Sequence, residues 1–270
     1  MEDKKIGKTI GKKLWQLFSY TISTILFLGL WELTARMHWL VNPKFLPPFT
    51  EVVATLWSII VSGELGMHIL VSLRRALMGF TLGCLFAVPL GLSIGWFKRF
   101  GNFISPLFQV FRNIPTLALL PVFVMFFGIS ETSKIVVIFW GVIWGVLLNS
   151  IAGVRSVDPQ LIRASRSMGT SPIRLFATVI LPASLPHIFA GMRLGATISI
   201  LILVAAEMIG ASRGLGYALS FYQAHMQYSY MYAYIIVMAV LGLLLNYTLG
   251  LVEKRSFRWR DESGATIDSR

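Results

Sequence analysis

Long apolar runs constrain this chain more than any other feature of its sequence. Mostly apolar stretches of about 20 residues or more lie at about 14–35, 71–96, 103–127, 133–154, 187–209 and 231–252. A helix of roughly 20 apolar residues crosses the hydrocarbon core of a bilayer. Charged residues make up only 13% of the 270 positions, whereas soluble domains carry about 25%. The sequence therefore predicts an all-α integral membrane protein with about six transmembrane helices.

These runs divide the chain into four segments. We expect a cytoplasmic basic leader over 1–13, a first transmembrane helix with an outer connection over 14–69, a core membrane domain over 70–252 and a cytoplasmic basic tail over 253–270. No small-residue cleavage site follows the first run, so we interpret it as a retained helix.

The distribution of Lys and Arg predicts the orientation. With the amino terminus inside, the leader, the 98–99 turn, the 154–186 loop and the tail hold 16 of the 24 Lys and Arg residues. The outer segments hold six, Arg74 and Arg75 among them. Cytoplasmic loops carry this excess in membrane proteins, so we expect both termini and the long loop to be cytoplasmic. The net charge of +12 then reflects topology, not nucleic-acid binding, which would collect basic residues on a soluble face or arm.

Four pairs of glycines have the spacing that lets membrane helices approach closely. A small residue at every fourth position leaves a groove for a neighbouring helix. We expect close packing at these pairs. The alternative is that glycine is simply common in membrane helices and that some of the pairs are incidental. The pairs are Gly79 with Gly83, Gly91 with Gly95, Gly141 with Gly145, and Gly191 with Gly195.

The polar segment 155–186 contains start and stop signals for two short helices. Asp158 before Pro159 is an N-cap followed by proline in the first turn. Gly169 is a C-terminal stop, and Ser171 before Pro172 repeats the start signal. We therefore expect two short helices joined by a glycine turn, with Leu181-Pro182 leading into the fifth span.

The first of these short helices has a mixed apolar and basic surface. Its apolar face comprises Leu161, Ala164, Ser165 and Met168 at spacings of three and four, and Arg163 and Arg166 lie beside it. Such a helix suits docking of a protein partner. The alternative is an interfacial helix that lies on anionic lipid.

The same loop resembles the loop shared by permeases of ABC importers, which reads Glu-Ala-Ala, three residues, Gly, nine residues, Ile, one residue, Leu-Pro. Ala164, Gly169 and Leu181-Pro182 fit this pattern, whereas Arg163 stands in place of Glu, Ser165 in place of the second Ala and Val179 in place of Ile. The stretches 111–118, 127–134 and 205–217 are similar to the nitrate/sulfonate/taurine-type branch, and the resemblance covers about residues 70–252.

This resemblance implies the type I ABC importer permease fold, with 70–252 as the core permease domain, in the cell membrane of a prokaryote. It implies an ATPase subunit dimer below the membrane, an extracytoplasmic substrate-binding protein and a second permease copy, here a homodimer. ATP hydrolysis then belongs to a separate chain, and this chain is a transport subunit without cofactor. The implied ATPase-coupling residues are Asp158, Leu161, Arg163, Ala164, Ser165, Met168, Gly169, Leu181 and Pro182.

The implied substrate is a small oxyanion such as nitrate, a sulfonate or taurine, but the sequence does not choose among them. It also does not distinguish a homodimer from a heterodimer. The replacement of Glu by Arg163 predicts an acidic partner for this position on the ATPase.

Three charged residues within the apolar runs are candidates for the translocation pathway, because charges inside a membrane are costly and usually functional. They are Arg112, Arg193 and Glu207. Arg112 and Arg193 lie toward cytoplasmic ends and can alternatively extend to the interface. Glu207 gates or braces the pathway, or it pairs structurally with the nearby Arg213.

Two other classes of function remain as alternatives, an ion-coupled secondary transporter and a membrane-embedded enzyme. The first usually shows repeated halves and acidic residues near the midplane. The second needs clustered acids, histidines or nucleophiles at one depth, whereas the 12 acidic residues are mostly terminal or in loops. The four histidines are scattered without ligand spacing, so no metal site is predicted.

Overall fold

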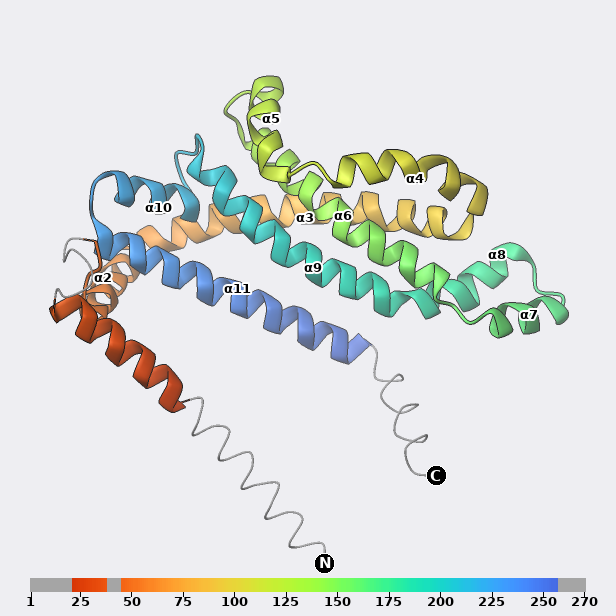
Figure 1. Cartoon of the computed structure of the whole chain (residues 1–270), viewed down its shortest axis with the longest axis horizontal. Coiled ribbons are helices and arrows are strands. Elements are labelled where there is room, and N and C mark those ends of the chain that lie inside the picture. The colour runs from red at the N-terminus through yellow and green to blue at the C-terminus, as the bar shows by residue number, and fades with distance from the viewer. Residues whose placement is uncertain (1–20, 38–44, 257–270) are drawn as a thin grey trace, which may run out of the picture. The chain divides into compact units, whose positions relative to one another are not determined.

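The computed structural model describes residues 21–37 and 45–256, and nearly all of them are helical (Figure 1). No strand occurs within these two ranges. The predicted leader at 1–13, the first part of the span at 14–35 and most of the tail lie outside the described residues. The prediction of an all-α chain is confirmed.

Contacts divide the chain into two compact units. The first comprises residues up to 65 together with 219–236, and the second comprises 66–218 together with residues from 237 onward. The first unit contains the helix over 21–37 and α2 (Phe49–Val61). Within this unit, Glu64 accepts hydrogen bonds from the hydroxyls of Tyr222 at 2.8 Å and Tyr234 at 3.0 Å.

Four helical stretches are long and apolar enough to cross a membrane. They match the predicted spans at 71–96, 133–154, 187–209 and 231–252. The helices are α3 (Glu64–Trp96), α6 (Glu131–Arg155), α9 (Leu181–Met208) and α11 (Tyr228–Ser256). The helix that includes α9 already begins at Pro172 and continues to Met208. Its interior proline, Pro182, lies two residues after a π-helical turn over Phe176–Ile180.

The predicted third span at 103–127 is not one straight helix. It consists of α4 (Lys98–Arg112), the 3₁₀ turn η1 (Thr116–Leu119) and α5 (Leu120–Phe127), and the two arms meet at 81°. The bend lies at Pro115, which has no N–H and disfavours the helical conformation of Ile114 before it. Counted as one broken span, this pair gives up to five apolar spans in the described residues.

The glycines of α3 pack directly against α6. A Cβ atom at each of four α3 glycines would lie within 2.6–2.8 Å of an α6 side chain, which is too close for any residue other than glycine. The contacts are Gly79 with Ile138, Gly83 with Val142, Gly91 with Ser150, and Gly95 with Val154. On α9, Gly191 and Gly195 likewise face Asn149 and Val146 of α6. The close packing predicted from the glycine pairs is confirmed for these helices.

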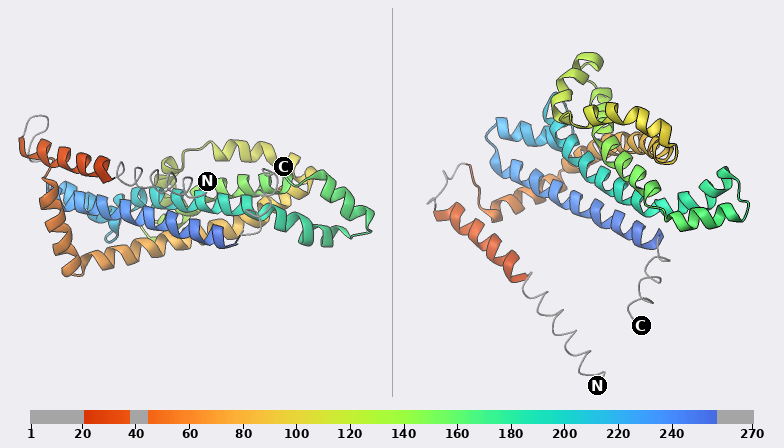
Figure 2. Two further views of the ribbon diagram at one scale, coloured as in Figure 1. Left: turned by 90° about the horizontal axis from the view of Figure 1, so that it is seen from below. Right: turned by 45° about the vertical axis from the view of Figure 1, so that its right-hand side comes forward.

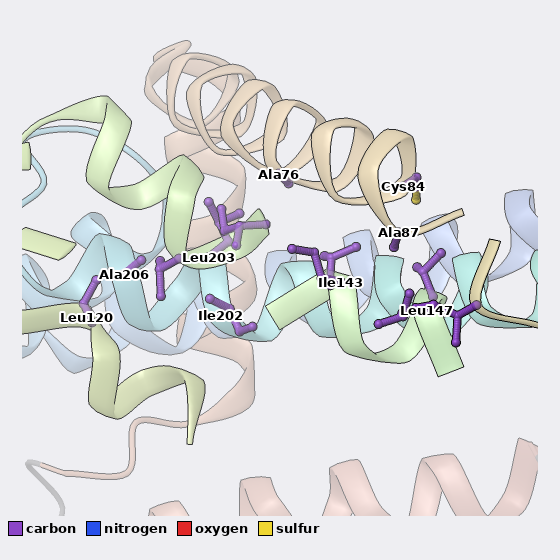
Figure 3. Packing of buried hydrophobic residues seen from close by; sticks show 14 residues of the cluster. Ala76, Cys84, Ala87, Leu120, Ile143, Leu147, Ile202, Leu203 and Ala206 are labelled. Carbon is purple, nitrogen blue, oxygen red and sulfur yellow. The ribbon is translucent and has the colours of Figure 1, made fainter. Parts of the chain in front are cut away.

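The main hydrophobic core lies where α3, α5, α6 and α9 meet (Figure 3). Ala87 of α3, Leu147 of α6 and Ala206 of α9 are almost completely buried there. Because α6 contacts both α3 and α9, it is the central helix of this unit.

Candidate functional site

The first helix of the polar loop begins where the sequence predicts. α7 (Pro159–Ser167) has Asp158 as its N-cap, and the Asp158 carboxylate accepts a hydrogen bond from the backbone N–H of Gln160 at 2.7 Å. Pro159 occupies the first turn, where its missing N–H costs nothing.

The glycine turn that ends α7 has the geometry of a Schellman motif. The Gly169 N–H donates to the Arg166 carbonyl at 2.9 Å, and the Thr170 N–H donates to the Ser165 carbonyl at 3.2 Å. Gly169 has φ +73°, in the left-handed region that favours glycine. A Cβ atom at Gly169 would meet nothing within 4 Å. The glycine requirement is therefore conformational and does not come from crowding.

The second short helix, α8 (Pro172–Leu175), continues through the π-helical turn η2 (Phe176–Ile180) into α9. Ser171 marks its start but forms no side-chain cap, unlike Asp158. Views from two further directions show α7 and α8 extending past the ends of α6 and α9 (Figure 2).

Most of the predicted coupling residues lie on the surface of this projecting loop. Leu161 is 53% exposed and Met168 76% exposed, and Ile173 of α8 reaches 84%. Arg163, Ala164 and Arg166 are also exposed. Ser165, by contrast, is 7% exposed, so its place in the coupling surface stays a prediction. Leu181 is partly buried and Pro182 is exposed.

The loop is attached to the membrane helices by a small core of its own. Leu175 and Ile180 are buried with Val154 and Val157, which lie at and just beyond the end of α6. The ring of Phe176 meets that of Trp96 at the end of α3, with centroids 5.7 Å apart. A force on α8 therefore acts directly on the ends of α3 and α6.

At the opposite end of this unit, Glu207 is completely buried and fully bonded. The Ser72 hydroxyl lies 2.8 Å from both carboxylate oxygens, Arg75 Nη1 donates to Oε1 at 2.8 Å, and the Gly216 N–H donates to Oε2 at 2.9 Å. The backbone N–H of Gly216 lies in the first turn of α10 (Leu215–Ala224). The Glu207 carboxylate thus also caps a helix N-terminus.

Arg75 is the centre of this charged cluster. Its Nε donates to Glu131 at 2.6 Å, and its Nη1 also donates to the carbonyl of Arg213 at 2.7 Å. Arg75 is 3% exposed within α3, so it lies inside a helix and not in a connecting loop. The side chain that pairs with Glu207 is Arg75, not the predicted Arg213.

Sequence reasoning missed Ser72, Arg75 and Glu131 as members of this cluster. A signal was present, because an arginine inside an apolar helix requires an acidic partner. The predicted span began at residue 71, which placed Arg75 at the membrane edge. The pairing also joins residues 132 positions apart in the sequence.

The three pathway candidates do not come together. Arg112 ends α4 and is exposed, whereas Arg193 is partly buried on α9, where α11 passes close by at Gly250. Arg193 and Glu207 lie on the same helix 14 residues apart, a separation of about 21 Å along the axis. They therefore lie at different depths.

Comparisons with known proteins agree with this architecture. Residues 79–258 match the family of binding-protein-dependent transport system inner membrane components. The putative aliphatic sulfonates transport permease protein SsuC of Bacillus subtilis (strain 168) is 33% identical, over 95% of this chain and 92% of its own length. The taurine transport system permease protein TauC of Escherichia coli (strain K12) is 34% identical, over 87% of each chain. The nitrate import permease protein NrtB of Leptolyngbya laminosa is 30% identical, over 93% of this chain and 91% of its own length.

Solved structures support the same fold. A chain of the MetNI methionine ABC transporter in an inward-facing conformation superimposes with a TM-score of 0.63 at 19% identity, covering 71% of this chain and 95% of that chain. Permeases of this kind are transport components without an enzymatic centre, so the membrane-enzyme alternative falls away. The chain therefore belongs to the family of binding-protein-dependent transport system inner membrane components, as the permease subunit of an ABC transporter.

Proposed function

We propose that this subunit forms the import pathway for a small oxyanion, such as taurine, another sulfonate or nitrate, and that a separate ATPase drives it by docking on α7 and α8. The observation that carries the coupling proposal is the surface of the loop. Leu161, Met168 and Ile173 expose large apolar side chains at a projecting end of the unit, beside exposed Arg163 and Arg166. Apolar side chains ringed by arginines are typical of the centre of a protein interface.

The attachment of the loop supports transmission of movement. Because Leu175 and Phe176 pack on the ends of α6 and α3, a displacement of α8 moves both helices. Rigid-body movement of packed helices is a common form of conformational switching. ATP hydrolysis on the partner then shifts the pathway between its inward and outward states.

The proposed assembly contains a homodimer of this chain, an ATPase dimer and an extracytoplasmic binding protein, with both termini in the cytoplasm. The excess of Lys and Arg in the predicted cytoplasmic segments supports this orientation. Arg163 is exposed on α7, so we expect it to meet an acidic residue of the ATPase. Arg112 and Arg193 stay pathway candidates, whereas the bonds of Glu207 favour a bracing role.

Replacement of Gly169 tests the coupling proposal. Gly169→Val forces a β-branched residue to φ +73°, which distorts the turn between α7 and α8. We expect the variant to fold in detergent but to lose co-elution with the ATPase. The matched control is Gly63→Val, because Gly63 has φ +77° and is also open within 4 Å but lies far along the chain from the loop. Retained co-elution of Gly169→Val, or equal loss in both variants, would contradict docking on this loop.

The substrate class is tested by uptake. The permease, its ATPase and its binding protein are reconstituted in liposomes, and ATP-dependent entry of labelled taurine, methanesulfonate and nitrate is compared with that of a neutral amino acid. We expect uptake of at least one oxyanion and none of the neutral solute. Uptake that persists without ATP under an ion gradient would favour the secondary-transporter alternative.

A further inference from the structure

Two tryptophans in α6 have buried indole N–H groups with no hydrogen-bond partner among the described residues. They are Trp140 and Trp144. Their rings are 5.3 Å apart between centroids, with planes at 77°. Residues four apart share one face of an α-helix, so both indoles lie on the same side of α6. Native proteins leave few buried donors unpaired, and those that exist call for a reason.

Both tryptophans lie near the middle of a membrane-spanning helix. α6 runs from Glu131 to Arg155, so its central residue is 143. The two indoles are therefore about one turn of helix apart around the middle of the bilayer, where no headgroup and little water is available as an acceptor.

Aromatic rings of the broken span cover the two indoles. Phe111 and Phe108 of α4 contact Trp140 and Trp144 with centroid distances of 5.8 and 6.1 Å, and Phe123 of α5 lies 6.3 Å from Trp140. Phenyl rings have no acceptor atom for an N–H group, and contacts to their π faces are weak substitutes for a hydrogen bond. The donors are thus covered without being satisfied.

The two helices that cover the indoles, α4 and α5, are separated by a bend. α4 and α5 meet at 81° around Pro115, and an interruption of this kind at membrane depth occurs where the backbone is buried in protein or lines a water-filled cavity. A change in this bend moves Phe111 and Phe123, which lie on opposite sides of it. The two indole N–H groups then become accessible together.

The hydrogen-bonding capacity of the two indoles indicates which class of ligand they can bind. An indole N–H is a donor with no acceptor capacity, so its missing partner carries acceptor oxygens. We propose that Trp140 and Trp144 form a transient subsite at which their N–H groups donate to the oxygens of a sulfonate or nitrate as it passes the middle of the membrane. Arg112 directly follows Phe111 and brings a positive charge to the same end of α4. This inference rests on the proposed function.

Phenylalanine substitution tests the subsite, because it keeps a ring in place and removes the N–H. The complete transporter carrying Trp140→Phe, Trp144→Phe or both is reconstituted in liposomes. Uptake of taurine, methanesulfonate and nitrate and binding-protein-stimulated ATP hydrolysis are measured per folded transporter. The control is Trp57→Phe, which makes the same substitution at an exposed tryptophan of α2.

We expect oxyanion uptake to fall about tenfold for each single variant, the typical effect of removing one hydrogen bond to a charged group. ATP hydrolysis should stay within about twofold of wild type, so that the ratio of solute imported to ATP hydrolysed falls. A purely structural role would lower both rates together or leave both unchanged, and either result overturns the subsite. Loss of the permease dimer in the double variant would also overturn it, because the N–H groups would then pair with the second copy. Absence of oxyanion uptake in the wild type overturns the proposed function itself.

Discussion

The two ends of the second unit differ in the kind of side chain that they expose and the kind that they bury. At the end with α7 and α8, large apolar side chains such as Met168 are exposed while the backbone turn is fully bonded. At the other end, Arg75 and Glu207 are buried, and their polar atoms have partners within the protein. The first end exposes an apolar surface that fits the proposed partner, whereas the charges of the second end are paired within the protein. Substitutions should therefore affect binding at the first end and stability at the second.

The largest loss of stability is expected from Arg75→Ala. It leaves the Glu207 carboxylate buried without its cation, which costs about 3–5 kcal/mol. Thermal unfolding in detergent can be followed through Cys84, which is the only cysteine and is buried. Arg74→Ala is the control, because Arg74 is the exposed neighbour. Equal midpoints for the two variants would show that the buried pair does not stabilise this end of the unit.

A smaller loss is expected from Gly91→Ala, between the two ends. The added Cβ would lie 2.6 Å from Ser150 Cβ and 3.0 Å from the Leu147 carbonyl, and overpacking of this kind costs about 1–3 kcal/mol. Gly242→Ala on α11 has nothing within 4 Å and should be neutral or stabilising by up to about 1 kcal/mol. The same thiol-based unfolding measurement compares them. A neutral Gly91→Ala would mean that α3 and α6 can separate at no cost.

Asp158→Ala should weaken the loop that contains α7 and α8, but only locally. Loss of the N-cap bond to Gln160 costs about 0.5–2 kcal/mol, and this cost falls on α7 alone. Amide hydrogen exchange should become faster in α7 and stay unchanged in α6. Asp158→Asn preserves a capping oxygen and serves as the control. Faster exchange throughout the unit would show that α7 is part of one cooperative core.

Met168→Ala should have the smallest effect on stability. The side chain is 76% exposed, so the change should stay within about 0.5 kcal/mol. The affinity for the ATPase should nevertheless fall about tenfold or more, as at other interface centres. Gln160→Ala, also exposed on α7, is the matched control in a binding titration. An unchanged affinity would remove Met168 from the docking surface.

The features that the sequence predicts well are local ones. The apolar runs locate α3, α6, α9 and α11, and Asp158-Pro159 and Gly169 locate both ends of α7, because caps and turns depend on a few adjacent residues. The glycine spacing also predicts the tight contact between α3 and α6, since only a helix can fill such a groove.

The features that sequence reasoning missed depend on distant residues. Arg75 and Glu207 meet only after α3 and α9 have packed on α6, and Ser165 is covered only after the loop folds back. Pro115 indicated an interruption of the helix. A proline alone, however, does not show whether the interruption is a mild kink or a bend of 81°.

The helical stretch from Pro172 to Met208 is unbroken over 37 residues, a length of roughly 55 Å. It begins in α8, on the proposed docking surface, and ends one residue after Glu207. If this stretch moves as a rigid rod, a tilt of about 5° about one end displaces the other end by roughly 5 Å. A displacement of this size is large enough to pull the Glu207 carboxylate away from Ser72 and Arg75, unless α3 moves with it.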